Sequence, residues 1–349
     1  MVVGEEHKDN LGDELNGGGR SADPADRARG RRKPPRSELG GRPNNQKAAR
    51  SSSRRNMNLN LNCLNQTTIR DYDIQCLIGQ GAFGVVQRAT TKANGQKVAI
   101  KQYDRSKLLQ DANRVVALNK ESAILAKLSH EGIMGFVDSI DSGNKINIVV
   151  EYINGNNLYQ YIRKLPESRI KDENEVKIIF KKTLESVQYM HEQRVIHRDL
   201  KLENILIDRK TQQTKLIDFG FATVVKSISE TKLPYSCGTP IYMCPEMAMK
   251  KEHLGGPSDV WALGVILFIL LTGKMPFHGG YEEDLFRKVI SGKYQWPHVL
   301  TDQKGQLAEI SQGAKNLVRR MLNPDQTRRP SAETLLQDTW LKSTAMPVT

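Results

Sequence analysis

The sequence predicts an α+β protein in which strands come first and long helices follow, behind a tail that builds no core. Short apolar runs bounded by glycines begin at Ile69. Apolar residues recur at helical spacing over residues 173–192 and fill residues 260–272. All 21 Phe, Trp and Tyr residues lie after residue 70, so we expect residues 1–70 to be disordered. The remaining chain is long enough for one large unit or for two lobes that share a cleft.

The excess of positive charge is concentrated in this tail. Residues 1–70 hold 14 Lys and Arg against 8 Asp and Glu, a net +6, whereas the rest of the +13 chain carries +7 over a length four times greater. The densest run, from Arg29 to Arg36, is a nuclear-import address, an electrostatic tether or plain solvated chain. Because the basic tail has no aromatic residue on which bases would stack, we expect no specific nucleic-acid partner.

Cysteine use and apolar run length predict the setting of the protein. Four cysteines in 349 residues, with no charged-then-apolar leader, favour a reducing cytoplasmic compartment, with a nuclear location left open by the basic run. The longest apolar run, over residues 260–272, is shorter than the ~20 residues that cross a bilayer. We therefore expect a buried core helix there and no membrane span.

A glycine-rich hairpin opens the strand region. The strand over residues 72–78 leads into Gly79-Gln80-Gly81-Ala82-Phe83-Gly84, and the β-branched pair Val85-Val86 continues as a second strand. Such a motif alone is weak, because ordinary turns contain it and a dinucleotide fold would use it to open a helix. Between two strands, bare glycine backbone can instead lie over the phosphates of a nucleotide. The glycines concerned are Gly79, Gly81 and Gly84.

A lysine and a glutamate that could form an ion pair follow, twenty residues apart in the sequence. Lys101 ends the strand Val98-Ala99-Ile100-Lys101, and Glu121 opens a helical pattern twenty residues later. If Lys101 projects into a cleft, Glu121 would hold its ammonium against phosphate oxygens, and each charge would make burial of the other tolerable. Taken singly, both would be ordinary surface residues.

The densest chemistry follows the helix predicted over residues 173–192. It comprises His197-Arg198-Asp199-Leu200-Lys201-Leu202-Glu203-Asn204 and, fourteen residues further on, Asp218-Phe219-Gly220. Asn204 and Asp218 offer hard oxygen ligands for Mg²⁺ on a triphosphate, and Asp199 can accept the proton of an attacking hydroxyl. Each motif alone is compatible with a charged loop, but their order along one chain points to phosphoryl transfer.

With these motifs the chain resembles the eukaryotic protein kinases over residues 72 to 341. Cys244-Pro245-Glu246, the run from Asp259 to Gly264, and Arg329 as partner of Glu246 extend the resemblance. It implies a two-lobed kinase fold, with a small antiparallel β lobe and one helix over about 72–150 and a larger mainly helical lobe over about 151–341. ATP would lie in the cleft of a domain covering residues 71–341, followed by a short tail at 342–349.

The resemblance also assigns roles to residues. Asp199 would orient and deprotonate the acceptor hydroxyl, Lys201 would stabilise charge on the transferred group, and Glu121 would hold Lys101 on the phosphates. A stack of Leu125, Phe136, His197 and Phe219, anchored by Asp259, would couple lobe closure to activity. The expected catalytic residues are Asp199, Lys201, Lys101 and Glu121; the Mg²⁺ ligands are Asn204 and Asp218; the ATP contacts are Gly79, Gly81, Gly84, Val86, Ala99, Lys101, Val150, Glu151, Leu206 and Asp218.

Two motifs favour serine/threonine specificity. Lys201 follows the Asp199-Leu200 pair, and Gly238-Thr239-Pro240 precedes the Cys244 motif. Within that division the chain resembles the calcium/calmodulin-dependent and SNF1-related group, which implies ATP and proteins with Ser or Thr acceptors as partners. The alternative is a catalytically inactive pseudokinase scaffold, which would show the loss of Lys101, Asp199 or Asp218.

Some positions depart from the family pattern. Tyr235 occupies the usual phosphothreonine position, and Thr223 stands where relatives frequently carry a basic partner for that phosphate. A phosphate there would meet Arg198 alone, so we expect basal activity without it. Met243, together with Pro240, would line an apolar pocket for the residue after the phosphoacceptor. Asn157 replaces a Glu that pairs with an upstream Arg in basophilic relatives, which predicts a mild basic preference.

Overall fold

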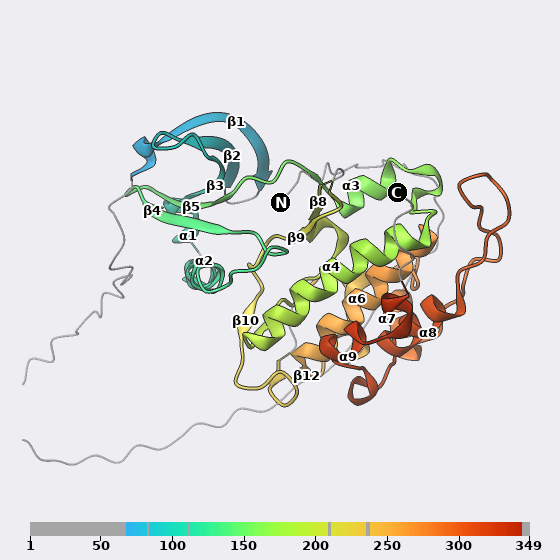
Figure 1. Cartoon of the computed structure of the whole chain (residues 1–349). Helices are drawn as coiled ribbons and strands as arrows, with labels where there is room; N and C mark the ends of the chain where they lie inside the picture. Colours follow the sequence, from blue (N-terminus) through green and yellow to red (C-terminus); the bar gives the residue numbers. More distant parts are fainter. Residues whose placement is uncertain (1–67, 82–83, 111, 209–210, 235–237, 344–349) are drawn as a thin grey trace, which may run out of the picture. The chain divides into compact units, whose positions relative to one another are not determined.

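The computed structural model describes residues 68–81, 84–110, 112–208, 211–234 and 238–343. The predicted tail with its run from Arg29 to Arg36 lies outside the described residues, apart from its last three positions, as do Tyr235 and most of the segment 342–349. Strands come first and helices follow, in the predicted order (Figure 1).

An antiparallel five-stranded sheet forms the small lobe, in the spatial order β1-β2-β3-β5-β4. A 3-10 helix at Ile69–Asp71 precedes it and is capped by Thr68. At the turn between β2 and β3, Gly95 has φ +70°, a left-handed conformation that glycine adopts without strain. The strands are β1 (Tyr72–Gly81), β2 (Gly84–Thr91), β3 (Lys97–Asp104), β4 (Phe136–Asp141) and β5 (Lys145–Glu151).

The two faces of this sheet are buried separately, which decides where the functional side chains of β3 lie. Val98 and Ile100 pack in a small cluster on one face, whereas Ala99 belongs to the large core that continues under α2 (Ala112–Leu125). Successive residues of a strand point to opposite faces, so Lys101 shares the face of Ala99. The short helix α1 (Arg105–Leu108) connects β3 to α2.

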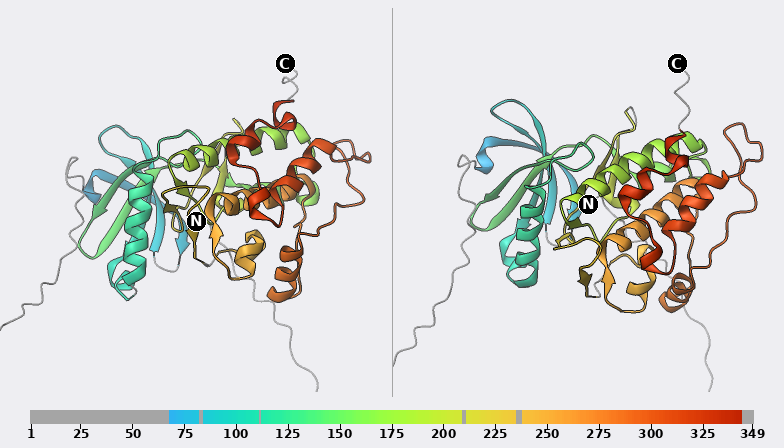
Figure 2. Two further views of the ribbon diagram at one scale, coloured as in Figure 1. Left: turned by 90° about the horizontal axis from the view of Figure 1, so that it is seen from below. Right: turned by 60° about the horizontal axis from the view of Figure 1, so that its bottom comes forward.

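The large lobe is mainly helical and packs around two long helices, α4 (Glu173–Glu192) and α6 (Gly255–Thr272) (Figures 1 and 2). Asp172 caps α4, since its side chain accepts the Asn174 N–H. The apolar positions recurring along α4 are buried, as their spacing predicts. The other helices are α3 (Leu158–Arg163), α5 (Pro245–Ala248), α7 (Glu282–Ser291), α8 (Gln312–Met321), α9 (Ala332–Leu336) and α10 (Thr339–Lys342), with 3-10 helices at Pro166–Ser168, Leu202–Asn204, Pro240–Tyr242 and Gln326–Arg328.

Helix α6 is the predicted core helix, and it starts five residues earlier than its apolar run. With 18 residues and a mean hydropathy of 1.6 it is long and apolar enough to cross a membrane, but 94% of it is buried inside the protein. A helix that is apolar on all sides is typical of a protein core as well as of a bilayer. Gly264 allows α8 to approach, because a Cβ there would lie 2.9 Å from Leu322 Cδ2. Gly273 ends the helix with φ +69°.

Short strands hold the loops of the large lobe. β6 (Asn156–Asn157), β8 (Ile205–Ile207) and β9 (Thr214–Leu216) form a sheet in the order β6-β8-β9. β7 (Val195–Ile196) pairs with β10 (Thr223–Val224), and β11 (Lys232–Leu233) pairs with β12 (His253–Leu254). Asp199 and Asn204 therefore lie between β7 and β8, and Asp218 lies between β9 and β10.

Candidate active site

A cavity of about 310 Å³ lies where the small lobe meets the large one. This volume is at the lower end of those that bind small organic ligands. Six predicted ATP contacts line it, namely Val86, Ala99, Lys101, Val150, Glu151 and Leu206. The structure adds Ile78 and Ile217, whose positions directly before the glycine motif and before Asp218 could have indicated them. It also adds Met134, which no sequence motif indicates.

Gly79, Gly84 and Asp218, which the sequence predicts as ATP contacts, are not among the described residues that line this cavity. Gly79 and Gly81 lie on β1, opposite Val86 and Gly84 of β2. Gly84 has a reason of its own to lack a side chain, because a Cβ there would lie 2.0 Å from the carbonyl oxygen of Gln102. The close approach of β3 therefore requires glycine at this position, whatever the strand does for a nucleotide.

Lys101 and Glu121 form the buried ion pair that their spacing predicted. Lys101 Nζ donates to Glu121 Oε1 at 2.9 Å, and the two side chains are 11% and 6% exposed. Burial alone would lower the pKa of Lys101, but the charges of Glu121, Tyr103 and Asp218 outweigh it and raise this pKa. The lysine is therefore held as a cation at the edge of the cavity.

Asp199 is fixed by three neighbours. Its carboxylate lies 2.8 Å from Lys201 Nζ and accepts hydrogen bonds from Asn204 Nδ2 at 3.0 Å and Thr239 Oγ1 at 3.3 Å. Lys201 Nζ also donates to Thr239 Oγ1 at 3.1 Å. The network joins the loop after β7 to the segment before α5, and it holds the carboxylate in one orientation.

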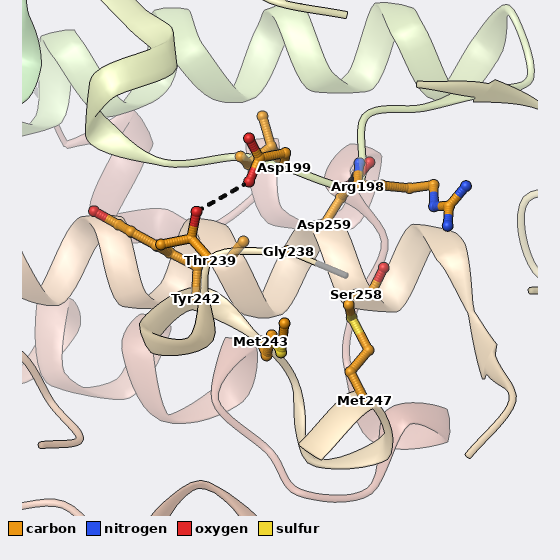
Figure 3. A pocket seen from close by; sticks show the side chains of 11 residues that line it. Arg198, Asp199, Gly238, Thr239, Tyr242, Met243, Met247, Ser258 and Asp259 are labelled. Atoms are coloured by element: carbon orange, nitrogen blue, oxygen red, sulfur yellow. Dashed lines mark hydrogen bonds between the residues drawn. The ribbon is translucent and has the colours of Figure 1, made fainter. Parts of the chain in front are cut away.

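Thr239 belongs to a small cavity of about 20 Å³ directly beneath Asp199 (Figure 3). Figure 3 shows the Thr239 hydroxyl bonded to Asp199, with Met243 and Met247 on the far side of the cavity. The volume suffices for about one water molecule. Met243, predicted to line a substrate pocket, is 5% exposed and faces this internal space.

Asn204 and Asp218 fit the Mg²⁺ ligation that the sequence predicts. Asn204 donates both bonds of its amide nitrogen to Asp199, to the backbone carbonyl at 2.9 Å and to the carboxylate, which leaves the amide oxygen as the ligand atom. Burial would raise the pKa of Asp218, but the charge of Lys101 outweighs it and lowers this pKa. Within the described part of the chain no three His, Cys, Asp or Glu residues cluster as a metal cage. Two protein oxygens completed by phosphates and water are typical of Mg²⁺.

Two backbone positions in the site are strained. Arg198 and Asp218 both have φ +69°, in the left-handed region that non-glycine residues rarely adopt. Strain of this kind costs about 1–3 kcal/mol and persists only where the surrounding structure enforces it. Here Asp259 supplies part of that enforcement, since its carboxylate accepts the N–H groups of His197 and Arg198, each at 3.0 Å.

Part of the predicted stack is in place, namely the contact between His197 and Phe219. The rings of His197 and Phe219 lie 5.1 Å apart, and both are fully buried together with Leu125. Phe136 packs half-buried against the same core. Burial lowers the pKa of His197, so the imidazole is neutral in the stack.

Glu151 lines the cavity but its carboxylate has other partners. Oε1 accepts the backbone N–H of Gly135 at 2.8 Å and lies 2.6 Å from Lys215 Nζ. The side chain therefore ties the end of β5 to β9. Because the carboxylate is occupied, we expect the predicted contact of Glu151 with ATP to be made by its backbone.

The structure adds a second cation to the activation region. Lys120 of α2 donates to Thr223 Oγ1 at 2.8 Å, and burial together with the nearby charge of Arg198 lowers the pKa of Lys120. An anion bound here would meet Lys120 as well as Arg198, whereas the sequence pattern predicts Arg198 alone.

Asn157, predicted to weaken the basic preference, is part of the fold. It is 2% exposed and caps α3 by accepting the Gln160 N–H at 2.8 Å.

Fold and site together define a protein kinase. Residues 72–341 match the family described as Protein kinase domain, and the chain belongs to that family. It is 35% identical over 273 residues to maternal embryonic leucine zipper kinase of Xenopus tropicalis, 34% over 270 residues to human NUAK family SNF1-like kinase 1, and 32% over 283 residues to CBL-interacting serine/threonine-protein kinase 26 of Arabidopsis thaliana.

These relatives confirm the predicted likeness to SNF1-related serine/threonine kinases. The three matches cover 78%, 77% and 81% of this chain, and 39%, 38% and 61% of the relatives. The chain thus spans about two fifths of the length of the first two relatives. In this chain the kinase domain match covers residues 72–341.

Proposed function

We propose that this protein transfers the γ-phosphoryl group of ATP to Ser and Thr hydroxyls of protein substrates. The observation that carries the proposal is the arrangement of Asp199, whose carboxylate is held by Lys201, Thr239 and Asn204 at 2.8–3.3 Å. Mg²⁺, when bound by Asn204 and Asp218 together with the phosphates, neutralises charge on the triphosphate.

In the proposed reaction, proton transfer and phosphate binding fall to different residues of the chain. Asp199 accepts the proton as the substrate oxygen bonds to the γ-phosphorus, the bond to the bridging oxygen breaks, and ADP leaves with that electron pair. Lys101, held as a cation by Glu121, binds the α and β phosphates, while Lys201 approaches the transferred group. Positioning and electrostatic stabilisation account for most of such catalysis.

A pseudokinase scaffold is the alternative function. It would have the same fold, but it has no need of an oriented Asp199 or of a lysine kept charged by burial beside Glu121. Both features are present in this chain, and they support the catalytic proposal over the scaffold.

The domain limits and location complete the proposal. The kinase domain covers residues 71–341 between a basic tail at 1–70 and a tail at 342–349. The protein acts in the cytoplasm, or in the nucleus if the run from Arg29 to Arg36 acts as an import signal.

Radiolabelled ATP and a randomised Ser/Thr peptide array test the proposal directly. We expect Mg²⁺-dependent labelling of Ser and Thr peptides, with an apolar preference after the acceptor and only a mild preference for Arg before it. Absence of labelling by well-folded protein, at any Mg²⁺ concentration, would favour the scaffold. Labelling confined to Tyr would overturn the assigned specificity.

A further inference from the structure

A second cavity, larger than the nucleotide cleft, lies on the large lobe. It is bounded by the end of α6, by α7 and by the segment 293–298, which follow one another along the chain (orange to red in Figures 1 and 2). Its volume is about 950 Å³, against about 310 Å³ for the cleft, and no residue lines both. We call it the basic groove.

The floor of the basic groove is aromatic. Phe268, Tyr294 and Trp296 line it, with ring centroids 4.8 Å apart for Phe268 and Trp296 and 6.0 Å apart for Tyr294 and Trp296. Phe268 is 1% exposed, so these rings are held by the core before anything binds. Met275, 43% exposed, stands at the rim. Aromatic residues and Met in such a setting are typical of protein interaction sites.

The rim of the basic groove is cationic. Its lining includes Lys274, Lys288, Lys293, His278 and His298 but no Asp or Glu among the residues described. Lys288 is partly neutralised, since its Nζ lies 3.2 Å from Asp284 and donates to the His278 carbonyl at 2.6 Å. Lys274 and Lys293 are exposed and form no ion pair with any other described residue. The groove is therefore complementary to an anion with an apolar part.

We propose that the basic groove binds an acidic peptide segment of a protein partner. An apolar or aromatic side chain of the segment lies against Trp296, and its carboxylates pair with Lys274 and Lys293. A peptide suits the groove better than a small anion does, because the volume is about three times that of the nucleotide cleft and the cations come from different segments, Lys274 after α6 and Lys293 after α7. The partner is thereby held at a place that Asp199 and the nucleotide leave free.

Fluorescence anisotropy tests the proposal with full-length protein and a labelled decapeptide of Asp and Glu around a central Leu-Trp pair. A peptide with Ser in place of every acid is the control. The variant Lys274→Glu/Lys293→Glu reverses the rim charge, and Lys107→Glu/Lys127→Glu makes the same change at exposed lysines of the small lobe. Trp296→Leu removes the indole while keeping an apolar side chain. Thermal unfolding of each variant verifies that it is folded.

We expect the acidic peptide to bind wild type and the small-lobe variant alike, and the rim variant at least about tenfold more weakly. Trp296→Leu should weaken binding severalfold, and added salt should weaken it in wild type, because exposed charges are screened. A nucleotide analogue should not compete. Equal binding by all variants, equal binding of the Ser peptide, or no binding to wild type would overturn the proposal. Tighter binding of a single-stranded oligonucleotide, lost in the rim variant, would overturn it in favour of nucleic acid.

Discussion

Each of the two lobes contains a buried lysine or arginine paired with a glutamate, and the two pairs are built differently. In the small lobe, Lys101 Nζ makes one hydrogen bond to Glu121 at 2.9 Å and lines the nucleotide cavity. An ammonium has three donors, so Lys101 retains donors for a ligand. In the large lobe, Arg329 Nη2 donates to both oxygens of Glu246, at 2.7 and 2.9 Å, and the Arg329 side chain is 0% exposed.

The remaining donors of Arg329 are satisfied by the fold. Nε donates to the Asn323 carbonyl at 2.8 Å and Nη1 to the Pro257 carbonyl at 3.3 Å, while the guanidinium lies 5.0 Å from the centroid of the Trp261 ring. A buried charge is tolerated when every polar atom has a partner. We therefore expect the saturated pair to stabilise the structure, and the pair with spare donors to serve the proposed nucleotide.

The largest expected effect is on catalysis, from breaking the small-lobe pair. Lys101→Met and Asp218→Asn should each lower the rate of peptide phosphorylation by several powers of ten, because they remove a phosphate clamp and a metal ligand. Lys101→Met should cost only about 1–3 kcal/mol of unfolding free energy, since water in the cavity that residue 101 lines can reach the Glu121 carboxylate left without its partner. Single-turnover kinetics and urea unfolding measure the two effects; activity near wild type in either variant would contradict the assigned roles.

The large-lobe pair should show the reverse pattern. Arg329→Met leaves Glu246 buried without a counter-ion, together with backbone carbonyls that lose their donor. We expect a loss of about 3–5 kcal/mol in unfolding free energy, typical of a broken buried ion pair. Folded protein obtained at low temperature should still bind ATP, as isothermal calorimetry would show. A loss of unfolding free energy smaller than that caused by Lys101→Met would contradict the structural role assigned to Arg329.

His253 of the large lobe is a buried titratable group that, unlike the two ion pairs, has no partner for its side chain among the residues described. His253 is 1% exposed, and neither ring nitrogen has a hydrogen-bond partner among the residues described. Burial and the charge of Arg198 lower its pKa, so the stability that its neutral form contributes is present above the unfolded pKa of about 6.5 and is lost as pH falls through the folded pKa.

His253→Phe should therefore reduce the loss of unfolding free energy between pH 7.5 and 5.5, by about 1 kcal/mol. Some dependence of the unfolding free energy on pH should remain in this variant, because burial also lowers the pKa of His197. Urea unfolding at both pH values measures this. A variant as acid-sensitive as wild type would show that His253 does not contribute.

The smallest effect is expected at the tie between the lobes. The side chains of Glu151 and Lys215 are 29% and 22% exposed, so their 2.6 Å contact is partly screened. Glu151→Gln keeps a hydrogen-bond acceptor and should cost about 1 kcal/mol or less, with the KM for ATP changed at most about threefold. Lys215→Met is the companion variant. A KM raised tenfold or more by Glu151→Gln would mean that this carboxylate itself meets the nucleotide.

The sequence by itself determined the order of the elements and six of the residues that line the cleft. Alternation along β3 places Ala99 and Lys101 on one face, and the helical spacing of α4 and the apolar run of α6 locate the core. The motif from His197 to Asn204 predicts the position of the proposed catalytic loop. These features are local, because backbone periodicity and the burial of apolar side chains fix them over a few residues.

Only the tertiary structure decided which distant residues meet. Lys120 reaches Thr223 across 103 positions, and Glu151 reaches Lys215 across 64, although no local pattern links either pair. The aromatic floor and cationic rim of the basic groove likewise come together only where the end of α6, α7 and the segment 293–298 line one cavity. Such contacts depend on how whole helices and strands dock, a choice made by packing over the entire core and not encoded in any short stretch of sequence.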